Sequence, residues 1–371
     1  MTKRVLIYDP VPFKGGSKTV MKTIIAELPS SIEVWVISND KDSWCDDCDV
    51  NVHFVPLFSP RYLQNKTTGI LYFIEHFIYL VSLLVNMIKL KRFSKIIGFS
   101  GPCVDFSLYL LTSIINIDII QLIQGNITDS RVSSFGLRRA KQVFYLPSTH
   151  TSILRALKCH SHNENIADHK FMTFVNGINC STIKVKEPSN KNNDKVGFLW
   201  AASLLKWKRV ELFIAAMVKL NSSYKDLDKF FASVCYIEPK TDAYIEVANL
   251  DKADNIYWYS DPNNLNDIRA SSSVFISTAE GEPFGLSILE SMAAGLAIVI
   301  PADNAYWDQH LTDGFDCVKY DPNKLESLVS ALTRLVNEPN FLLKISQQAK
   351  LSAQQYCHLR CYSHILKCIP N

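Results

Sequence analysis

Short β-rich runs alternate with helical stretches along the 371 residues, and this alternation passes through the chain twice. The first series of strand-like runs is RVLIYD, SIEVWVIS, NVHFVPL, KIIGFS, DIIQLIQ and QVFYLP, and the second is VGFLWAAS, KFFASVCYI, NIYWYS, SVFIST and LAIVIP. Strands that are joined through helices pair in parallel, so each series predicts a doubly wound sheet. The sequence therefore predicts an α/β chain with two Rossmann-like doubly wound domains facing across a cleft.

A polar stretch, KVKEPSNKNNDK from Lys184 to Lys195, separates the two series and is expected to be a linker. We therefore expect an N-terminal domain over residues 1–183 and a C-terminal domain over residues 196–350. The last stretch, Phe341 to Ile369, has a helical pattern, and residues 351–371 are expected to pack back on the N-terminal domain.

Composition places the chain among soluble globular proteins, because 47% of its residues are hydrophobic and 20% are charged. The net charge of +3 is divided unevenly. Residues 1–180 contain 19 Lys and Arg against 14 Asp and Glu, whereas residues 181–371 contain 20 against 22. The basic first half suits an anionic partner such as a phospholipid surface. No signature of a nucleic-acid-binding protein accompanies it, so no nucleic acid is expected as a partner.

Ten cysteines are scattered through the chain, and its start, MTKRVLIYDP, reads as a strand and not as a signal peptide. Both features favour a reducing cytoplasm. Cys45 with Cys48 and Cys357 with Cys361 lack partner pairs at zinc-finger spacing. The tract CHSH, which ends at His162, is more typical of a polar surface loop. We therefore expect no bound metal.

The apolar segment ILYFIEHFIYLVSLLVNMIKLKR, Ile70 to Arg92, has the length of a transmembrane helix. Glu75, His76 and Asn86 interrupt it, and the strand-like run KIIGFS follows, so a spanning helix would pull one domain apart. Two interpretations remain open. The segment is either a core helix of the first domain or an interfacial helix that dips into a bilayer surface beside its basic end, KLKR.

The stretch EGEPFGLSILESMAAGLAIVIP, Glu280 to Pro301, has the pattern of a loop, a helix, a glycine stop and a buried strand. Its helix has no Ser, Thr, Asp or Asn directly before it, so the first N–H groups lack side-chain caps and can bind a phosphate. Glu290 lies about five residues into the helix, so it can bracket a ligand together with Glu282. Alternatively, both are ordinary acidic residues, and the helix dipole favours Glu282.

The part EGEPFGLSILESMAAG resembles the E-x7-E signature of GT-B glycosyltransferases of family 4 (glycosyl transferases group 1), with Glu282 and Glu290 as the two acids. DPVPFKGGSKTVMKTIIAEL resembles the Gly-rich loop and helix after the family's first strand. FVNGIN resembles the segment that closes the first domain, and WAASLLKWKRVELFIAAM the basic loop that opens the second. The resemblance extends over nearly the whole chain. It implies an acceptor-side first domain and a second domain that binds a nucleotide-sugar.

The resemblance also implies roles for the residues of this motif. The helix N-terminus, with the amides around Phe284, Gly285 and Leu286, binds the diphosphate of the nucleotide-sugar. Glu290 holds both ribose hydroxyls, for which a carboxylate offers two acceptor oxygens. Glu282 contacts the sugar itself.

The resemblance also implies a cation in the basic loop of the second domain and a close approach of the first domain's backbone to the donor. Lys208, in WKRV, matches the family's basic-loop lysine and is the candidate cation beside the departing diphosphate. Gly15 and Gly16 would let the backbone of the first domain approach the donor closely. Family members usually carry an arginine five residues before the lysine, where this chain has Ser203. Either Lys206 or Arg209 supplies the second positive charge, or there is only one.

A second departure concerns the first domain. A histidine that is often found in the cleft of the family has no obvious counterpart here. At the comparable strand end the chain has QLIQGNITDS. Gln124, Gly125 and Asn126 therefore either line the acceptor or sugar pocket or belong to an ordinary polar loop. In the second domain, Asp308 stands about where the family often has a glutamate.

These features lead to the hypothesis of a retaining, metal-independent glycosyltransferase, with retention implied by the family. It would transfer a sugar from a nucleotide-sugar donor, with a UDP-sugar favoured over a GDP-sugar. The acceptor would be a hydroxyl of a glycan or lipid-linked glycan in bacterial lipopolysaccharide, capsule or exopolysaccharide biosynthesis. We expect a cytoplasmic protein without a cofactor, with peripheral contact to an anionic membrane at the inner face of the plasma membrane.

DCD, Asp47 to Asp49, matches the Asp-x-Asp with which the other major glycosyltransferase fold holds a divalent ion, but it lies in an acidic loop and is interpreted as a coincidence. A non-hydrolysing nucleotide-sugar epimerase could use the same helix-bound diphosphate. A non-catalytic nucleotide-sugar-binding scaffold would agree with the missing arginine and histidine.

Overall fold

The computed structural model describes residues 3–45, 52–60, 68–90, 93–159, 169–185, 195–224, 229–238, 245–247, 250 and 253–369. The chain forms two compact units, Met1–Gly177 with His358–Asn371, and Ile178–Cys357. Four features of the sequence fall wholly or mostly outside the described residues: the expected linker, the DCD motif, the histidines of CHSH, and the basic residues Lys91 and Arg92.

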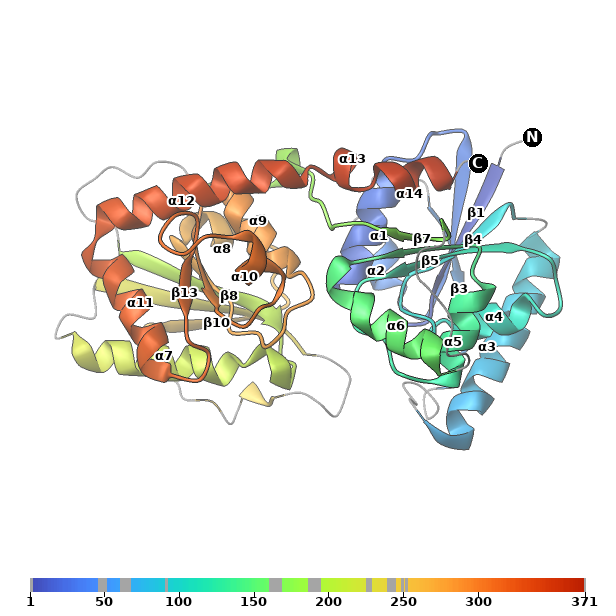
Figure 1. The fold of residues 1–371 in the computed structure, drawn as a ribbon, viewed down its shortest axis with the longest axis horizontal. Coiled ribbons are helices and arrows are strands. Elements are labelled where there is room, and N and C mark those ends of the chain that lie inside the picture. Colours follow the sequence, from blue (N-terminus) through green and yellow to red (C-terminus); the bar gives the residue numbers. More distant parts are fainter. Residues whose placement is uncertain are drawn as a thin grey trace. The chain divides into compact units, whose positions relative to one another are not determined.

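The first unit is built on a parallel sheet with the strand order β3-β2-β1-β4-β5-β6-β7 (Figure 1). The strands are β1 (Lys3–Asp9), β2 (Ile32–Ser38), β3 (Val52–Pro56), β4 (Lys95–Gly98), β5 (Asp118–Ile123), β6 (Gln142–Tyr145) and β7 (Phe171–Thr173). The order reverses between β1 and β4, since β2 and β3 lie on one side of β1. The loops after β1 and β4 therefore start at a topological switch point, where doubly wound sheets bind ligands.

Helices cover both faces of this sheet. Right-handed crossovers that proceed in opposite directions from β1 and β4 place their helices on opposite faces. They are α1 (Gly16–Ala26), α2 (Asp42–Cys45), α3 (Gly69–Leu90), α4 (Phe106–Leu111), α5 (Arg131–Arg139), α6 (His150–Lys158), α13 (His358–Cys361) and α14 (Ser363–Cys368). Consecutive helices from α3 to α6 contact one another and form one layer. The C-terminal helices are tied to the first unit by Tyr362, whose hydroxyl donates to the Gly177 carbonyl at 2.9 Å.

The second unit repeats the design with the strand order β10-β9-β8-β11-β12-β13. The strands are β8 (Val196–Ser203), β9 (Phe230–Ile237), β10 (Ile256–Ser260), β11 (Val274–Ile276), β12 (Ala297–Pro301) and β13 (Val318–Tyr320). The order reverses between β8 and β11, so the loops after these two strands form the second switch point. Strand β12 is buried along its whole length, as expected for a parallel strand covered on both faces.

The helices of the second unit form two layers around its core. They are α7 (Val210–Ser223), α8 (Leu265–Ser271), α9 (Leu286–Ala294), α10 (Tyr306–His310), α11 (Leu325–Asn337) and α12 (Pro339–Ala353). Helix α11 packs against α7, whereas α12 packs against α9 and β12. Aromatic and aliphatic side chains such as Phe198, Phe213 and Leu332 are completely buried between helices and sheet.

The predicted fold class is confirmed, and the differences lie at the ends of the elements. The units meet at Gly177–Ile178 and at Cys357–His358, whereas the sequence analysis placed the boundaries at residues 183 and 350. The stretch from Phe341 to Ile369 is helical, as expected, but in pieces: α12 ends at Ala353 within the second unit, and two short helices, α13 and α14, follow in the first. Strands β7 and β13, of three residues each, were not expected.

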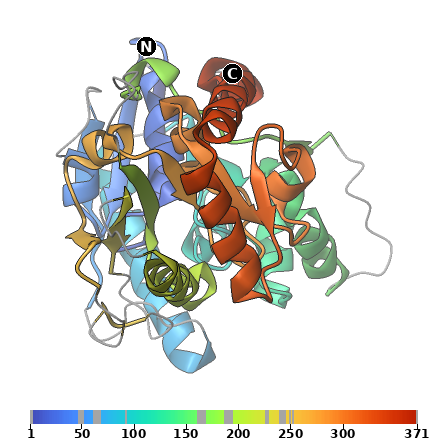
Figure 2. The same cartoon turned by 90° about the vertical axis from the view of Figure 1, so that its left-hand side faces the viewer.

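Helix α3 covers one face of the first unit but leaves an apolar stripe exposed. Tyr79, Leu80 and Leu83 enter the core, whereas Phe77 is 61% exposed and Ile88 82% exposed. The other exposed apolar residues of α3 recur at helical spacing: Ile70, Leu71, Phe73, Ile74, Val81 and Val85. One end of α3, in light blue, projects beyond the neighbouring helices of its unit (Figures 1 and 2). By length and composition alone α3 could cross a membrane.

Candidate functional site

Two loops meet at the switch point of the second unit. The loop after β8 contains residues 204–209, and the loop after β11 contains residues 277–285. Backbone contacts join them: the Glu280 N–H donates to the Trp207 carbonyl, and the Thr278 hydroxyl donates to the Lys208 carbonyl, both at 2.8 Å. Side chains from two distant parts of the sequence are therefore held side by side at the carboxyl edge of the sheet.

Helix α9 starts in this place with an uncapped N-terminus. Its N-cap residue, Gly285, has a φ of 77°, and no side chain among the described residues caps the first turn. A Cβ at Gly285 would lie 3.0 Å from Glu282 Cγ and from Ile288 Cδ1, so both the backbone angle and the space require glycine. Unpaired N–H groups and the helix dipole make this end suitable for an anion such as a phosphate group.

Lys208 and Glu282 form an ion pair across the two loops. Both side chains are mostly buried, with 16% and 14% of their surface exposed. The Lys208 ammonium also lies 4.1 Å from the centroid of the Trp207 ring, which adds a cation–π contact. The predicted sugar-contacting acid and the predicted cation are thus neighbours, and each neutralises the other.

The second acid of the motif is paired as well. Glu290 lies on α9, and its Oε2 accepts from Nη2 of Arg269, on α8, at 2.5 Å. The Arg269 side chain is almost completely buried, and Glu290 retains some exposed surface. Burial raises the pKa of Glu290, and the guanidinium of Arg269 opposes that rise. Arg269 was missed by the sequence analysis, because nothing in its spacing links α8 to the acid 21 residues later.

Phe284 contributes only its backbone to this end of the helix. Its side chain is buried, with ring centroids 4.8 Å from Tyr306 and 5.1 Å from Trp307. This aromatic cluster fixes the turn before Gly285 and Leu286 from the inside. A ligand at the helix start would therefore meet amides and not the phenyl ring.

The residues around Lys208 differ in their exposure and conformation. Ser203 ends β8, and Lys206 is exposed. Arg209 is half-buried and has a φ of 52°, a left-handed conformation that costs a non-glycine residue about 1 kcal/mol or more. Its positive charge lowers the pKa of Tyr320, although burial raises that pKa more. Asp308, on α10, pairs with Lys319 at 2.8 Å.

In the first unit, Gly15 and Gly16 mark the start of α1 after the β1 loop. Gly15 has an extended backbone, and a Cβ added there would meet no atom within 4 Å. Packing inside the unit therefore does not explain this glycine. The prediction that it lets a ligand approach remains a prediction.

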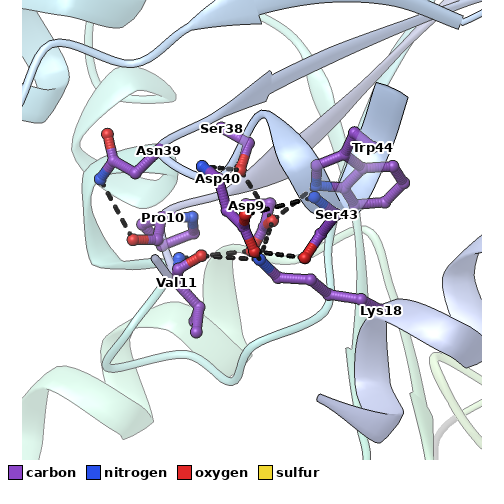
Figure 3. Close-up of polar contacts among 9 residues, drawn as sticks. All are labelled: Asp9, Pro10, Val11, Lys18, Ser38, Asn39, Asp40, Ser43 and Trp44. Atoms are coloured by element: carbon purple, nitrogen blue, oxygen red, sulfur yellow. Dashed lines mark hydrogen bonds and ion pairs between the residues drawn. The ribbon is translucent and has the colours of Figure 1, made fainter. Parts of the chain in front are cut away.

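A buried charged network, which the sequence analysis missed, anchors this loop (Figure 3). The Lys18 ammonium lies 3.1 Å from Asp9 Oδ2 and 2.6 Å from Asp40 Oδ2, and it donates to the Val11 carbonyl at 2.8 Å. Trp44 Nε1 donates to Asp9 at 2.8 Å. The network links the ends of β1 and β2 to the first turn of α1, so it holds the loop between β1 and α1 in one conformation.

A further buried acid, Asp105, lies in the loop after β4 and directly precedes α4. Asp105 is completely buried, and its Oδ2 accepts from Gln121 Nε2 at 2.9 Å and from the Ser100 N–H at 3.0 Å. Burial raises the pKa of Asp105 to about 7, although these hydrogen bonds oppose the rise. The negative charge of Asp9 adds to the rise. This edge of the first unit therefore contains two carboxyl groups within electrostatic reach of each other.

The residues Gln124, Gly125 and Asn126 follow β5 at the same edge of the first sheet. Gln124 Nε2 approaches the Ser17 carbonyl at 3.5 Å, a long contact. Asn126 lines an open cavity of about 540 Å³, whose lining residues are of polar types except for Ile127. The other lining residues are Ile127, Thr128, Asp129, Ser148, Thr151, Ser152 and Arg155.

Among the described residues, no group of three or more His, Cys, Asp or Glu side chains is arranged to hold a metal ion. Within the part of the chain that the structure describes, Cys45, Cys357 and Cys361 form no disulfide, and Cys45 is exposed. The DCD motif lies outside the described residues, so its interpretation stays a prediction.

Residues 181–352 match the family model described as Glycosyl transferases group 1. A glycosyltransferase of uncharacterised specificity from Haemophilus influenzae is 29% identical over 110 residues, which are 29% of this chain and 30% of that protein. An alpha-monoglucosyldiacylglycerol synthase from Acholeplasma laidlawii is 24% identical over 172 residues, 46% of this chain and 42% of that protein. The matches thus span less than half the length of these relatives.

The fold has relatives among solved structures. The Anabaena protein HepE in complex with UDP-glucose superimposes with a TM-score of 0.74 and 12% sequence identity, and 99% of each chain is covered. At this identity the likeness concerns the fold alone. The chain therefore has the two-domain GT-B fold, and its residues 181–352 are similar to the group 1 glycosyl transferases.

Proposed function

We propose that the chain is a retaining, metal-independent glycosyltransferase of family 4 that transfers a sugar from a nucleotide-sugar to a hydroxyl of a glycan or lipid-linked glycan. The observation that carries this proposal is the uncapped start of α9 at Gly285, flanked by Lys208, Glu282 and Glu290 in one unit. In the reaction, the bond between C1 of the sugar and the diphosphate oxygen breaks. The acceptor oxygen bonds to C1, and its proton leaves to the diphosphate or to water.

The donor would bind along the start of α9. The diphosphate accepts from the free N–H groups after Gly285, as phosphates do at helix N-termini. Glu290 accepts from ribose hydroxyls, and Glu282 from a hydroxyl of the sugar. The complex of the structurally similar HepE with UDP-glucose supports a nucleotide-sugar in this fold and favours a UDP-sugar over a GDP-sugar.

Donor binding would exchange the Lys208–Glu282 ion pair for contacts with the donor. The ammonium of Lys208 would turn to the diphosphate, whose negative charge grows as the sugar leaves. Glu282 would be released for the sugar. Because both side chains are partly exposed and lie on loops, this exchange needs no change in the core.

Arg209 is the better candidate for the second positive charge that Ser203 does not supply. Lys206 is exposed, whereas Arg209 is half-buried and kept in a left-handed conformation. A residue held in a costly conformation is often retained for function. The stored strain therefore favours Arg209 as a diphosphate ligand.

The acceptor would bind to the first unit, in the polar cavity beside Asn126. Asp129 and Arg155, both in its wall, provide an acceptor for sugar hydroxyls and a donor for an anionic group. Gln124 and Gly125 lie next to it in the chain. A glycan precursor that carries a phosphate or diphosphate, as in bacterial lipopolysaccharide, capsule or exopolysaccharide synthesis, fits this chemistry.

Contact with an anionic membrane at the inner face of the plasma membrane is the second part of the proposal. The exposed apolar stripe of α3 and the basic first half of the chain support it. The name of the A. laidlawii relative, a glucosyldiacylglycerol synthase, supports a lipid-bearing acceptor. Phe77→Glu should lower co-sedimentation with anionic liposomes at low salt at least about fivefold. The substitution places a charge on the exposed apolar stripe that would enter the bilayer surface.

Leu351→Glu, on α12, is the matched control because Leu351 is also exposed and apolar. If the wild-type protein stays in the supernatant with anionic liposomes, or if Phe77→Glu binds as well as the wild type, membrane contact through α3 is wrong.

The transferase activity is tested by release of nucleoside diphosphate from UDP-, GDP- and ADP-sugars with candidate lipid-linked acceptors, with and without EDTA. We expect one donor to be used, with no effect of EDTA, and Glu282→Ala to be inactive. NMR of the donor without acceptor detects an epimerase by a changed sugar. Donor binding without turnover on any acceptor would favour the scaffold over the transferase.

A further inference from the structure

Arg269 is the least exposed charged residue near the motif, and no sequence signal pointed to it. Only 1% of its surface is exposed. Its Nη2 donates to Glu290 Oε2 at 2.5 Å, and its Nη1 donates to Asn266 Oδ1 at 2.7 Å. Asn266 and Arg269 lie three residues apart on α8, so the same helix that carries the guanidinium also orients it. The plane of the guanidinium is fixed on two sides.

The carboxylate of Glu290 has one occupied side and one open side. Oε2 accepts a hydrogen bond from Arg269, and no hydrogen-bond donor to Oε1 is found among the described residues. The Glu290 side chain is 20% exposed, and that of Arg269 only 2%. The carboxylate therefore lies between the guanidinium and the solvent, with Oε1 free for a ligand that reaches α9.

The environment of Glu290 disfavours its charge unless Arg269 is present. Burial raises the pKa of Glu290, and Arg269 is the one described charged group that acts against this rise. Helix α9 packs against α8, α12 and β12. The charged residue of α12 that comes near α9 is Lys350, whose Cδ would lie 3.8 Å from a Cβ at Gly295, the opposite end of the helix from the ligand. Without Arg269, protonation of Glu290 would extend to higher pH.

We propose that Arg269 is a positioning residue for the donor: it holds Glu290 as a carboxylate with Oε2 engaged, so that Oε1 accepts from the ribose of a nucleoside diphosphate. The inference rests on the proposed function, because it needs a ribose at α9. It adds a residue outside the motif to nucleotide recognition. It also predicts that affinity depends on the protonation of one carboxyl group.

A purely structural role for Arg269 predicts something different. In that case its substitution would lower stability, and the folded fraction would bind nucleotide with wild-type affinity at every pH. A positioning role predicts a loss of affinity in the folded protein that changes with pH. Affinity measured against pH therefore separates the two roles.

The experiment is calorimetric titration of the full chain with UDP, or with whichever of UDP, GDP and ADP the wild type binds, between pH 6 and pH 9. Five variants are compared with the wild type: Arg269→Met, Arg269→Lys, Asn266→Ala, Glu290→Gln and Arg334→Met. Arg334→Met is the control, because Arg334 pairs with Glu338 at 3.1 Å on an exposed helix surface. Circular dichroism selects the variants that fold.

Arg269→Met should bind about 30-fold more weakly than the wild type at the acid end of this range, because Glu290 loses the group that keeps it ionised and oriented, and the ribose loses a hydrogen bond to a charged group. The deficit should shrink as the pH rises to 9 and Glu290 ionises. Arg269→Lys keeps the positive charge but lacks the planar guanidinium that donates to both Glu290 and Asn266, so we expect the affinity to fall about fivefold. Asn266→Ala should lower the nucleotide affinity less than the Arg269 substitutions do. Glu290→Gln should bind the nucleotide weakly at every pH in this range.

The contrary results are equally defined. Wild-type affinity and pH profile in a folded Arg269→Met or Arg269→Lys would overturn the inference while leaving the proposed function intact. If Arg269→Met does not fold, Arg269→Lys and Asn266→Ala decide, since both keep Glu290 intact. If the wild type binds none of the nucleoside diphosphates, the proposed function fails and the inference fails with it.

Discussion

The two acids of the motif lie eight residues apart, and each is paired with a cation, but the two pairs are built differently. Lys208 and Glu282 lie on loops, both are partly exposed, and the cation is a single ammonium on a flexible chain. Arg269 and Glu290 lie on two packed helices, and the guanidinium is buried and fixed by Asn266. The first pair can open without disturbing the fold, whereas the second is part of the core.

This difference predicts that the first pair affects turnover and the second affects stability. An ion pair between two loops contributes about 0–1 kcal/mol to stability when both side chains can turn to solvent on separation. Removing one partner of a buried pair costs about 3–5 kcal/mol, because the other charge is left without compensation. Substitutions in the first pair should therefore change turnover with little change in stability. Substitutions in the second should change stability and binding together.

The largest effect is expected for Glu282→Ala. It removes the sugar-contacting acid, so kcat should fall about 1000-fold or more, equivalent to about 4 kcal/mol of transition-state stabilisation. Its free energy of unfolding should stay within about 1 kcal/mol of the wild type. Steady-state kinetics and urea unfolding measure the two quantities. Turnover near the wild-type rate would remove Glu282 from the site.

Arg269→Met should lower the free energy of unfolding by about 3 kcal/mol, because Glu290, whose side chain is 20% exposed, is left without its buried cation. Lys208→Met should lower it by less than about 1 kcal/mol. Urea unfolding of both variants compares the pairs directly. Equal losses would mean that the two pairs do not differ as their burial indicates.

Lys208→Met should lower kcat about 100-fold, since the departing diphosphate loses its nearest cation. Lys206→Met is the matched control, because Lys206 is exposed and lies two residues earlier. Its kcat should remain within about twofold of the wild type, as expected for a surface charge. If Lys206→Met lowered kcat more than Lys208→Met does, the cation beside the diphosphate would be Lys206.

The smallest effect concerns Arg209, whose left-handed backbone is strained. Arg209→Gly should raise the free energy of unfolding by about 1 kcal/mol, because glycine adopts this conformation without steric cost. The same change should weaken nucleoside diphosphate binding about tenfold, since a charge-assisted hydrogen bond is lost. Stability and affinity would thus move in opposite directions. Unchanged affinity would leave Arg209 without a role in the donor site.

The sequence was sufficient to predict the features that repeat or that depend on local backbone chemistry. Both sheets follow from the alternation of strands and helices. The uncapped start of α9 follows from Gly285 and from the absence of a capping side chain before it. The family resemblance implied that Lys208 and Glu282 both serve the donor, and the structure pairs them with each other.

Contacts between residues far apart in sequence were not predictable. Arg269 meets Glu290 only because α8 packs beside α9, and Lys18 meets Asp9 and Asp40 only because β1 and β2 are neighbours. No periodicity encodes such a pairing. The boundary within the C-terminal helical stretch was also missed, because the break after Ala353 is fixed by packing and not by a glycine or proline.

The central claim is that the start of α9 binds a nucleoside diphosphate without a metal. The most direct measurement is a thermal-shift panel of UDP, GDP, ADP and CMP, with and without EDTA, on the wild type and on Glu290→Ala. The account predicts stabilisation by one nucleoside diphosphate, unaffected by EDTA and weakened in the variant. Stabilisation that needs a divalent ion, or that persists unchanged in Glu290→Ala, would contradict it.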